Sequence, residues 1–208
     1  MDNRLFTGEL TKLTACNPES DAKIMEVWHR DTEFFRLAYG RIAQPWSVEH
    51  IKKRIENHGG EVNEPVFAIR TLADDKLIGQ IGLWIEPSQV EGFVWILIGE
   101  RDYWGRGFGT DAMRVLLRYA FRELNLHRVV LRVFAFNTRA IRSYEKVGYV
   151  HEGRVRNALN RMGQRWDEVW MGITRSDWER QSAAPKNRGE NNDEYDNRSA
   201  GYIKPVGA

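Results

Sequence analysis

The stretch Tyr103-Trp104-Gly105-Arg106-Gly107-Phe108-Gly109-Thr110, called the glycine loop below, decides how this chain is interpreted. It follows an apolar run from Phe93 to Gly99 and precedes a helical pattern from Asp111 to Leu124. Three glycines in five residues leave little side-chain bulk between the backbone and an approaching group. Their amides can point into one concavity, and the following helix adds the positive end of its dipole. The sequence therefore predicts a phosphate or pyrophosphate site here.

Two common nucleotide-binding fingerprints do not match this loop. A Walker-type loop needs a Gly-Lys-Ser or Gly-Lys-Thr sequence, whereas the chain has Gly109-Thr110-Asp111 without a lysine. A dinucleotide-binding loop has the spacing G-x-G-x-x-G near the start of a parallel unit. Gly105, Gly107 and Gly109 are spaced G-x-G-x-G, after several predicted strands. Both readings are therefore disfavoured.

The composition is that of an ordinary folded domain. The chain has 208 residues, of which 42% are hydrophobic and 29% charged, and a formal charge of +2. That charge is too small to indicate a nucleic-acid partner, although arginines around the glycine loop suit an anionic cofactor. No apolar span approaches the roughly 20 residues of a membrane helix. The single cysteine, Cys16, fits a reducing compartment. We expect a cytoplasmic protein without nucleic-acid or membrane partners.

Residue patterns along the chain predict a mixed α/β fold. Strands are expected at 10–15, 65–71, 77–86, 92–99, 129–136, 149–156 and 165–174, and helices at 18–28, 31–37, 47–57, 111–124 and 138–147. This order implies a mixed sheet with helices on both faces. The run 92–99 is apolar enough to predict burial on both sides of the strand. Residues 1–181 are expected to form one domain, and residues 182–208 a flexible tail.

Three segments together resemble the GNAT acyl-CoA N-acyltransferases. They are Tyr103 to Asp111, the segment Asn137-Thr138-Arg139-Ala140-Ile141-Arg142-Ser143-Tyr144-Glu145-Lys146-Val147-Gly148-Tyr149, and Met171-Gly172-Ile173. The most similar group is RimJ/RimL-like and contains ribosomal-protein N-terminal acetyltransferases and spermidine acetyltransferases. The likeness spans roughly residues 5–179. It implies the GNAT fold, with a mixed, mostly antiparallel sheet, and acetyl-CoA as co-substrate without a metal.

The resemblance also implies positions for the cofactor. The loop amides wrap the pyrophosphate of coenzyme A; they belong to Trp104, Gly105, Arg106, Gly107, Phe108, Gly109 and Thr110. The preceding strand, around Ile98, Gly99 and Glu100, splays from its neighbour at a bulge and pairs with the pantetheine arm. An extended polyamide can dock on such an edge like an added strand. An amide near Ile98 would then polarise the thioester carbonyl.

Side chains of the second segment complete the implied site. Asn137 would contact the pantetheine, and capping of the following helix is an equally good reading of it. Tyr144 would lie near the sulfur as the general acid for the leaving thiolate, with simple packing as the alternative. Ser143 and Lys146 join the expected cofactor-binding residues. For Arg106, Arg139 and Lys146 individually, a solvated surface position is as good a reading as a phosphate contact.

The general base is less well marked. Family members often carry an acidic residue near Phe93, but Phe93 and Trp95 make this strand apolar. Glu100 is the remaining catalytic candidate, with Asp102 nearby, although solvated turn positions are the favoured reading of both. The histidines show no metal-ligand spacing, so no metal site is expected.

These features predict acetyl transfer from acetyl-CoA to a primary amine by direct attack in a ternary complex. The acceptor is a protein N-terminus, a polyamine or another small amine, bound between residues 18–58 and the last hairpin. Candidate acceptor-site residues are Glu33, Glu49, Glu56 and Glu61, for which a solvated helix face is the alternative, and the aromatic Trp28, Phe34, Phe35, Trp46 and Trp84, for which core packing is favoured. A non-catalytic acyl-CoA sensor or scaffold is the other function that fits, and a homodimer is compatible with the family.

Overall fold

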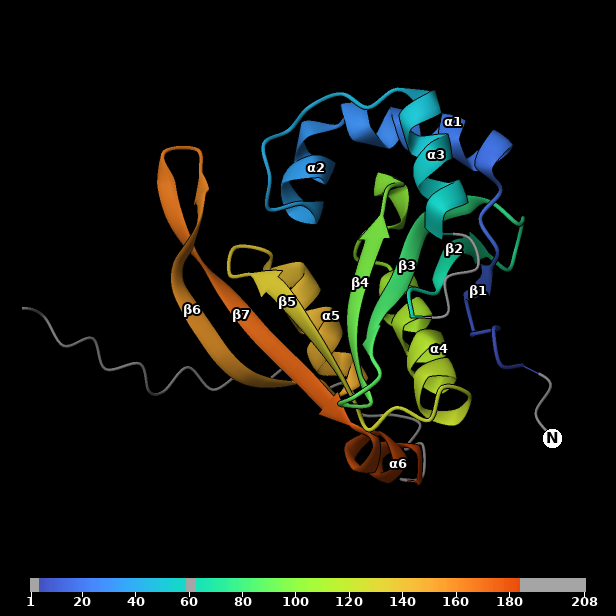
Figure 1. The fold of residues 1–208 in the computed structure, drawn as a ribbon, viewed down its shortest axis with the longest axis vertical. Coiled ribbons are helices and arrows are strands. Elements are labelled where there is room, and N and C mark those ends of the chain that lie inside the picture. The colour runs from blue at the N-terminus through green and yellow to red at the C-terminus, as the bar shows by residue number, and fades with distance from the viewer. Residues whose placement is uncertain (1–3, 59–62, 184–208) are drawn as a thin grey trace, which may run out of the picture.

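A single mixed sheet organises the chain, as the computed structural model shows for residues 4–58 and 63–183 (Figure 1). Its seven strands lie in the order β1-β2-β3-β4-β5-β7-β6. They are β1 (Thr11–Thr14), β2 (Val66–Thr71), β3 (Leu77–Glu86), β4 (Glu91–Ile98), β5 (Arg128–Phe134), β6 (Val150–Arg161) and β7 (Gln164–Thr174). Among these strands only β4 and β5 pair in parallel. The predicted fold class is confirmed.

Helices connect the strands and cover both faces of the sheet. They are α1 (Pro18–Arg30), α2 (Thr32–Ala38), α3 (Val48–His58), α4 (Phe108–Arg122), α5 (Thr138–Val147) and α6 (Arg175–Ala183), with a 3-10 turn η1 at Arg101–Tyr103. Each of the first two helices begins at a residue whose side chain accepts backbone amides, Asn17 for α1 and Asp31 for α2. None of these helices is long and apolar enough to cross a membrane.

Two hydrophobic clusters lie on opposite faces of the sheet. The larger one packs α4, through residues such as Leu116 and Phe121, against the central strands. The second joins α1, α2 and α3, with Phe35 and Trp46 among its buried rings. Neighbouring residues Ala68 and Ile69 belong to different clusters because successive strand residues point to opposite faces.

The parallel pair β4–β5 opens after a short contact. Only Glu91↔Arg128, Gly92↔Val129 and Phe93↔Val130 are paired, and the strands then diverge into a V (Figure 1). The register of β4 with β3 runs without a shift from Glu86↔Glu91 to Gly79↔Ile98. The expected splay is therefore confirmed. Just beyond Ile98 the amides of Gly99 and Glu100 both donate to the Ile78 carbonyl, so two residues oppose one, as expected of a bulge at this place.

Burial of β4 also differs from the sequence-based expectation. Gly92 and Val94 are buried, whereas the other residues of this strand are half-exposed. The expectation of burial on both faces is therefore wrong, because the second half of β4 borders the opening and lacks a neighbour on that side.

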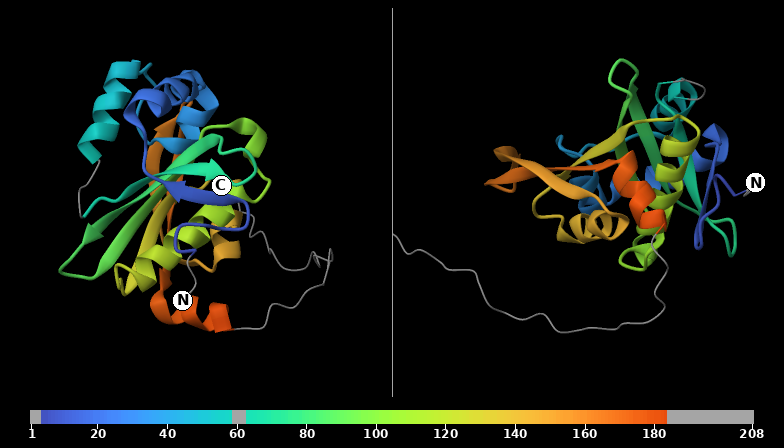
Figure 2. Two further views of the ribbon diagram at one scale, coloured as in Figure 1. Left: turned by 90° about the vertical axis from the view of Figure 1, so that its right-hand side faces the viewer. Right: turned by 90° about the horizontal axis from the view of Figure 1, so that it is seen from below.

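The C-terminal part adds a hairpin and a helix. Strand β6 extends to Arg161, five residues beyond the expected strand end, and with β7 forms a hairpin that projects from the rest of the molecule (Figure 2). Arg161 donates to the carbonyls of Tyr39 at 2.6 Å and Arg41 at 2.7 Å, which ties the hairpin to the chain after α2. Helix α6 includes Ser182 and Ala183, so the start of the expected tail is helical, and residues 184–208 lie outside the described part.

Candidate active site

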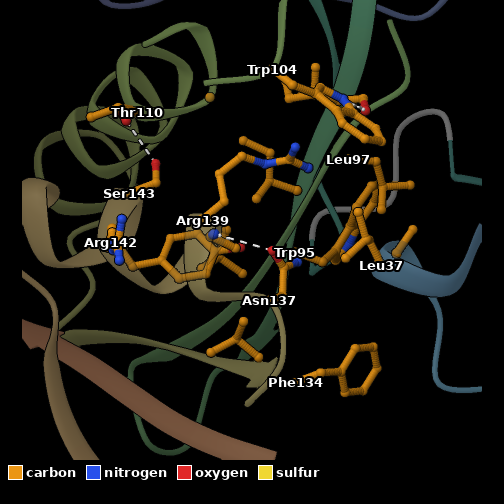
Figure 3. Close-up of a pocket in the computed structure, with 18 of the residues that line it drawn as sticks. Leu37, Trp95, Leu97, Trp104, Thr110, Phe134, Asn137, Arg139, Arg142 and Ser143 are labelled. Atoms are coloured by element: carbon orange, nitrogen blue, oxygen red, sulfur yellow. Dashed lines mark hydrogen bonds between the residues drawn. The ribbon is translucent and has the colours of Figure 1, made fainter. Parts of the chain in front are cut away.

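A cavity of about 900 Å³ occupies the opening between β4 and β5 (Figure 3). Its wall is formed by these two strands, the glycine loop, the start of α4, α5, α2 with the residues that follow it, one residue each of β3 and β7, and residues 9–10. This volume falls within the usual range for small-molecule and cofactor sites. The cavity is therefore large enough for a cofactor together with a small acceptor.

The cavity passes through the sheet and has two chemically different halves. On β4, Ile96 and Ile98 pack toward α4, whereas Leu97 packs toward α1–α3. Phe93 and Trp95 share the face of Leu97, because side chains alternate along a strand. We call the side formed by the glycine loop, α4 and α5 the loop half. The side formed by α2, Glu168 and the Phe93 face is called the aromatic half.

The glycine loop presents unpaired amides to the loop half. Gly105 and Gly107 have φ of +72° and +89°, and Gly107 is the N-cap of α4. The Trp104 amide donates to the Arg101 carbonyl, and the Asp111 amide is the next along the chain with a backbone partner. Within the described residues, the amides from 105 to 110 have no hydrogen-bond partner. Such amides at a helix N-terminus form an anion-binding site.

The loop residues differ in what they contribute. Gly105, Gly107, Gly109 and Thr110 line the cavity, as does Trp104. The side chains of Arg106 and Phe108 are not part of the cavity wall: Arg106 donates to the Asp102 carbonyl at 2.9 Å, and the Phe108 ring lies 4.8 Å from the Tyr103 ring. These two residues can therefore contribute backbone amides only.

Basic side chains surround the loop amides. Arg114, Arg139, Arg142 and Lys146 all line the loop half (Figure 3 labels Arg139 and Arg142). The Arg139 guanidinium lies 4.1 Å from the centre of the Trp104 ring, and burial lowers its pKa. Four cations beside unpaired amides make this half attractive to a phosphorylated ligand.

Two short contacts fix the geometry of the loop half. The hydroxyls of Thr110 and Ser143 lie 2.7 Å apart and join α4 to α5 (Figure 3). The Asp111 carboxylate accepts the amides of Glu9, Leu10 and Thr11 and the Thr11 hydroxyl, at 2.7 to 3.0 Å. Asp111 therefore fastens the start of β1 to the first turn of α4, a positioning role that sequence reasoning missed.

Backbone groups of β4 face the opening. The Gly99 amide donates to the Ile78 carbonyl on β3, so by alternation the amides of Val94, Ile96 and Ile98 point toward β5. The Ile98 carbonyl already accepts the Trp104 indole at 2.8 Å. Gly99 is not brought to the cavity: its amide is used by β3, and an added Cβ would overlap the Trp28 ring.

Asn137 and Tyr144 both line the cavity. The Asn137 side chain accepts the Ala140 amide at 3.2 Å, so the capping reading is confirmed. Tyr144 packs against Tyr149 with ring centres 6.0 Å apart, and burial raises the pKa of Tyr144 to about 12. Its phenol is therefore protonated at neutral pH and can act as a proton donor.

Glu100 is not brought to the cavity. Its carboxylate accepts the Trp28 indole at 2.8 Å and pairs with Lys76 at 2.7 Å. Burial raises its pKa, but the contacts with Lys76 and Trp28 outweigh burial and leave the pKa lowered. Its position and lowered pKa favour a structural role for Glu100 over that of a base.

The aromatic half differs from the expected acceptor wall. Helix α2 supplies Phe34 and Leu37, followed by Tyr39, whereas α1 and α3 supply no lining residue. Trp28, Phe35 and Trp46 are core residues, and Phe34 and Trp84 line the cavity. Among the expected acidic residues, Glu33 pairs with Arg101, Glu49 pairs with Lys53, Glu56 is exposed away from the cavity and Glu61 lies outside the described residues.

Sequence reasoning missed several lining residues. Arg142 belongs to the same helical face as Arg139 and Lys146, a spacing that could have identified it. Arg132, Phe134 and Glu168 reach the cavity through the β5–β7 pairing, Arg132↔Trp170 and Phe134↔Glu168. No local pattern marks that register. Among the described residues, no group of three or more His, Cys, Asp or Glu side chains could hold a metal ion.

Comparisons with known proteins agree with this geometry. The family model for the acetyltransferase (GNAT) domain matches residues 12–150, which include the glycine loop and α5. YokL of Bacillus subtilis, an uncharacterized N-acetyltransferase, is 28% identical over 174 residues, covering 84% of this chain and 95% of YokL. YjcK, a probable N-acetyltransferase of the same species, is 31% identical over 137 residues, covering 64% of this chain and 75% of YjcK.

A solved structure shows the same fold. The spermidine N-acetyltransferase of Vibrio cholerae, in complex with CoA and spermine, superimposes with a TM-score of 0.72 at 24% identity and covers 81% of this chain and 97% of that one. The family match, the relatives and the open β4–β5 pair beside a glycine loop lead to one assignment: the chain belongs to the GNAT family of acetyltransferases.

Proposed function

We propose that this protein transfers the acetyl group of acetyl-CoA to a primary amine, which attacks the thioester directly. The observation that carries the proposal is the row of amides from 105 to 110, which lack partners within the described residues and border the cavity at the N-terminus of α4. A pyrophosphate satisfies such amides with charge-assisted hydrogen bonds. The Vibrio cholerae protein with this fold was solved with CoA bound.

Coenzyme A would extend from the glycine loop into the opening of the sheet. Arg114, Arg139, Arg142 and Lys146, which line the cavity, would neutralise its phosphates. The pantetheine amides would pair with the outward-facing backbone groups of Val94 and Ile96, as an added strand does. The Asn137 side-chain amide borders the same path.

The reaction then needs an oxyanion donor and an acid. The amine nitrogen attacks the thioester carbon, and the Ile98 amide, which faces the opening, would stabilise the developing oxyanion. The C–S bond breaks, and the phenolic proton of Tyr144 passes to the leaving thiolate. The attacking nitrogen loses its proton to a carboxylate or to water. The raised pKa of Tyr144, about 12, keeps the phenol protonated before the transfer.

The direct test combines cofactor binding with thiol release. The protein is titrated with CoA by calorimetry, and then incubated with acetyl-CoA and a panel of primary amines while free thiol is recorded. We expect CoA to bind and at least one amine to accelerate thiol release, with the acetylated amine seen by mass spectrometry. Absence of CoA binding would overturn the proposal. Binding without amine-dependent release would reject catalysis and leave an acyl-CoA-binding module.

A further inference from the structure

The aromatic half contains a carboxylate without a hydrogen bond. Glu168 lies on β7 opposite Phe134, and its side chain is 17% exposed. Its nearest cation is the Arg132 guanidinium, with Nη1 3.6 Å from Oε1, which is longer than a hydrogen bond. Among the described residues no donor is bound to this carboxylate, so its oxygens are available to a ligand.

The other lining carboxylates belong to the loop half. Asp111 is used by four hydrogen bonds from the start of β1. Glu9 lies in that same N-terminal turn, with its amide bonded to Asp111. Within the described part of the cavity wall, Glu168 is therefore the acidic group that faces the aromatic half.

Aromatic rings form the wall beside Glu168. Trp84 stacks on Phe93 with ring centres 5.5 Å apart, and Trp95 lies 6.4 Å from Trp84. Leu37 and Tyr39 line the α2 side of the same cavity, and Figure 3 shows Leu37 and Trp95 among its lining residues. Such a wall takes up an apolar substituent and also attracts a cation to its ring faces.

The surroundings of this wall are positively charged. Arg132 lies 5.1 Å from the Phe93 ring centre and 5.5 Å from that of Trp170. Arg139 and Arg142 line the path toward the glycine loop. The described part of the cavity wall therefore has one carboxylate, that of Glu168, available on this side, and several guanidinium groups around it. A ligand with one ammonium gains the Glu168 contact, whereas each further ammonium would be repelled.

We propose that the aromatic half is an acceptor subsite for a primary ammonium that donates to Glu168 while a single aromatic or branched apolar group contacts Trp84, Phe93 and Trp95. This inference rests on the proposed function and names its substrate class: an apolar monoamine, in preference to a polyamine. A small arylalkylamine and the N-terminus of a peptide with a large apolar first residue share this chemistry.

An amine series tests the class. Rates of thiol release from acetyl-CoA are compared for phenethylamine, hexylamine, spermidine and a peptide amide that begins with phenylalanine. We expect kcat/KM for phenethylamine to exceed that for spermidine by at least about tenfold, with hexylamine between them. The ratio of kcat/KM for phenethylamine to kcat/KM for the peptide shows whether the preferred acceptor is a small arylalkylamine or a peptide N-terminus. Equal or better use of spermidine would overturn the inference.

A matched pair of variants tests the residue. Glu168→Gln removes the charge that holds the ammonium, and Glu152→Gln removes a carboxylate that pairs with Arg128 at 2.6 Å outside the cavity. We expect KM for phenethylamine to rise at least about tenfold in Glu168→Gln and to change less than about twofold in Glu152→Gln. The Kd for CoA should be unchanged in both. An unchanged KM in Glu168→Gln would contradict the assignment.

Equilibrium binding separates this inference from the proposed function. Phenethylamine is titrated by calorimetry into each protein saturated with CoA. Weaker binding to Glu168→Gln than to Glu152→Gln supports the subsite even if no amine is acetylated, in which case only the proposed reaction fails. Acetylation of amines with equal phenethylamine binding by both variants rejects the subsite and leaves the reaction standing.

Discussion

The two halves of the cavity recognise their ligands by different means. The loop half is built from consecutive backbone amides of residues 105–110 and from nearby helix positions such as Arg139 and Arg142. The aromatic half is built from side chains that are far apart in the sequence, such as Leu37, Trp84 and Glu168. Backbone recognition depends on a local conformation, whereas side-chain recognition depends on strand register and packing. We therefore expect cofactor binding to depend on loop conformation and acceptor choice on single side chains.

The largest expected effect tests whether the loop half takes part in the reaction itself. Tyr144→Phe removes the proton donor, and we expect kcat to fall about 100-fold while the Kd for CoA changes less than about threefold. Tyr149→Phe is the matched control, because Tyr149 is 3% exposed, lies beside Tyr144 and is outside the cavity wall. An unchanged kcat in Tyr144→Phe would leave only a packing role.

The pH dependence of kcat and of stability is a second test of the role of Tyr144. Its folded-state pKa of about 12 lies above the ordinary tyrosine value of roughly 10, because burial disfavours the phenolate. The resulting stability is present below about pH 10 and is lost as the pH rises toward 12. We expect kcat between about pH 8 and pH 10 to show no loss from this group. A descending ionisation in that window that Tyr144→Phe abolishes would contradict the raised pKa, while still assigning the acid to Tyr144.

A second variant tests how firmly the loop half is attached to the rest of the fold. Asp111→Asn removes the charge that accepts three amides and one hydroxyl. Hydrogen bonds to charged groups contribute about 1.5–3 kcal/mol, so we expect the unfolding free energy to fall by about 2 kcal/mol. Urea denaturation measures it. An unchanged midpoint would mean that these bonds are dispensable.

A matched glycine pair tests backbone recognition. Gly105 and Gly163 both have φ of +72° and open space around a would-be Cβ, but Gly163 lies at the β6–β7 turn. Valine in this conformation costs about 1–2 kcal/mol at either position. We expect Gly105→Val to raise the Kd for CoA about tenfold by displacing the loop amides. Gly163→Val should bind CoA normally, and equal Kd values would show that loop geometry is unimportant.

The smallest expected effect concerns Glu100. Its carboxylate is held by Trp28 and Lys76 away from the cavity. We expect Glu100→Gln to change kcat/KM for any accepted amine by less than about twofold, with a small loss of thermal stability. A large fall in kcat, with an altered pH profile, would restore Glu100 as the base.

Much of the fold could be predicted from local patterns. Caps at Asn17, Ser47 and Asn137 begin helices as expected, and the Met162-Gly163 turn joins the last two strands. The remaining features of the fold depend on contacts between residues far apart in the sequence, which no local pattern predicts. The strand at 92–99 was expected to be buried on both faces, but β5 diverges from it. The homodimer and the cytoplasmic location stay predictions.

The sequence by itself determined the loop half: its glycines allow positive φ, and the helix after them adds its dipole, both short-range effects. Tertiary structure alone decided which carboxylate reaches the cavity. The pairing Phe134↔Glu168 brings in a residue from a distant strand, while Trp28 and Lys76 turn Glu100 away. Strand register and side-chain packing join residues that are far apart in the chain, and only the folded molecule brings them together.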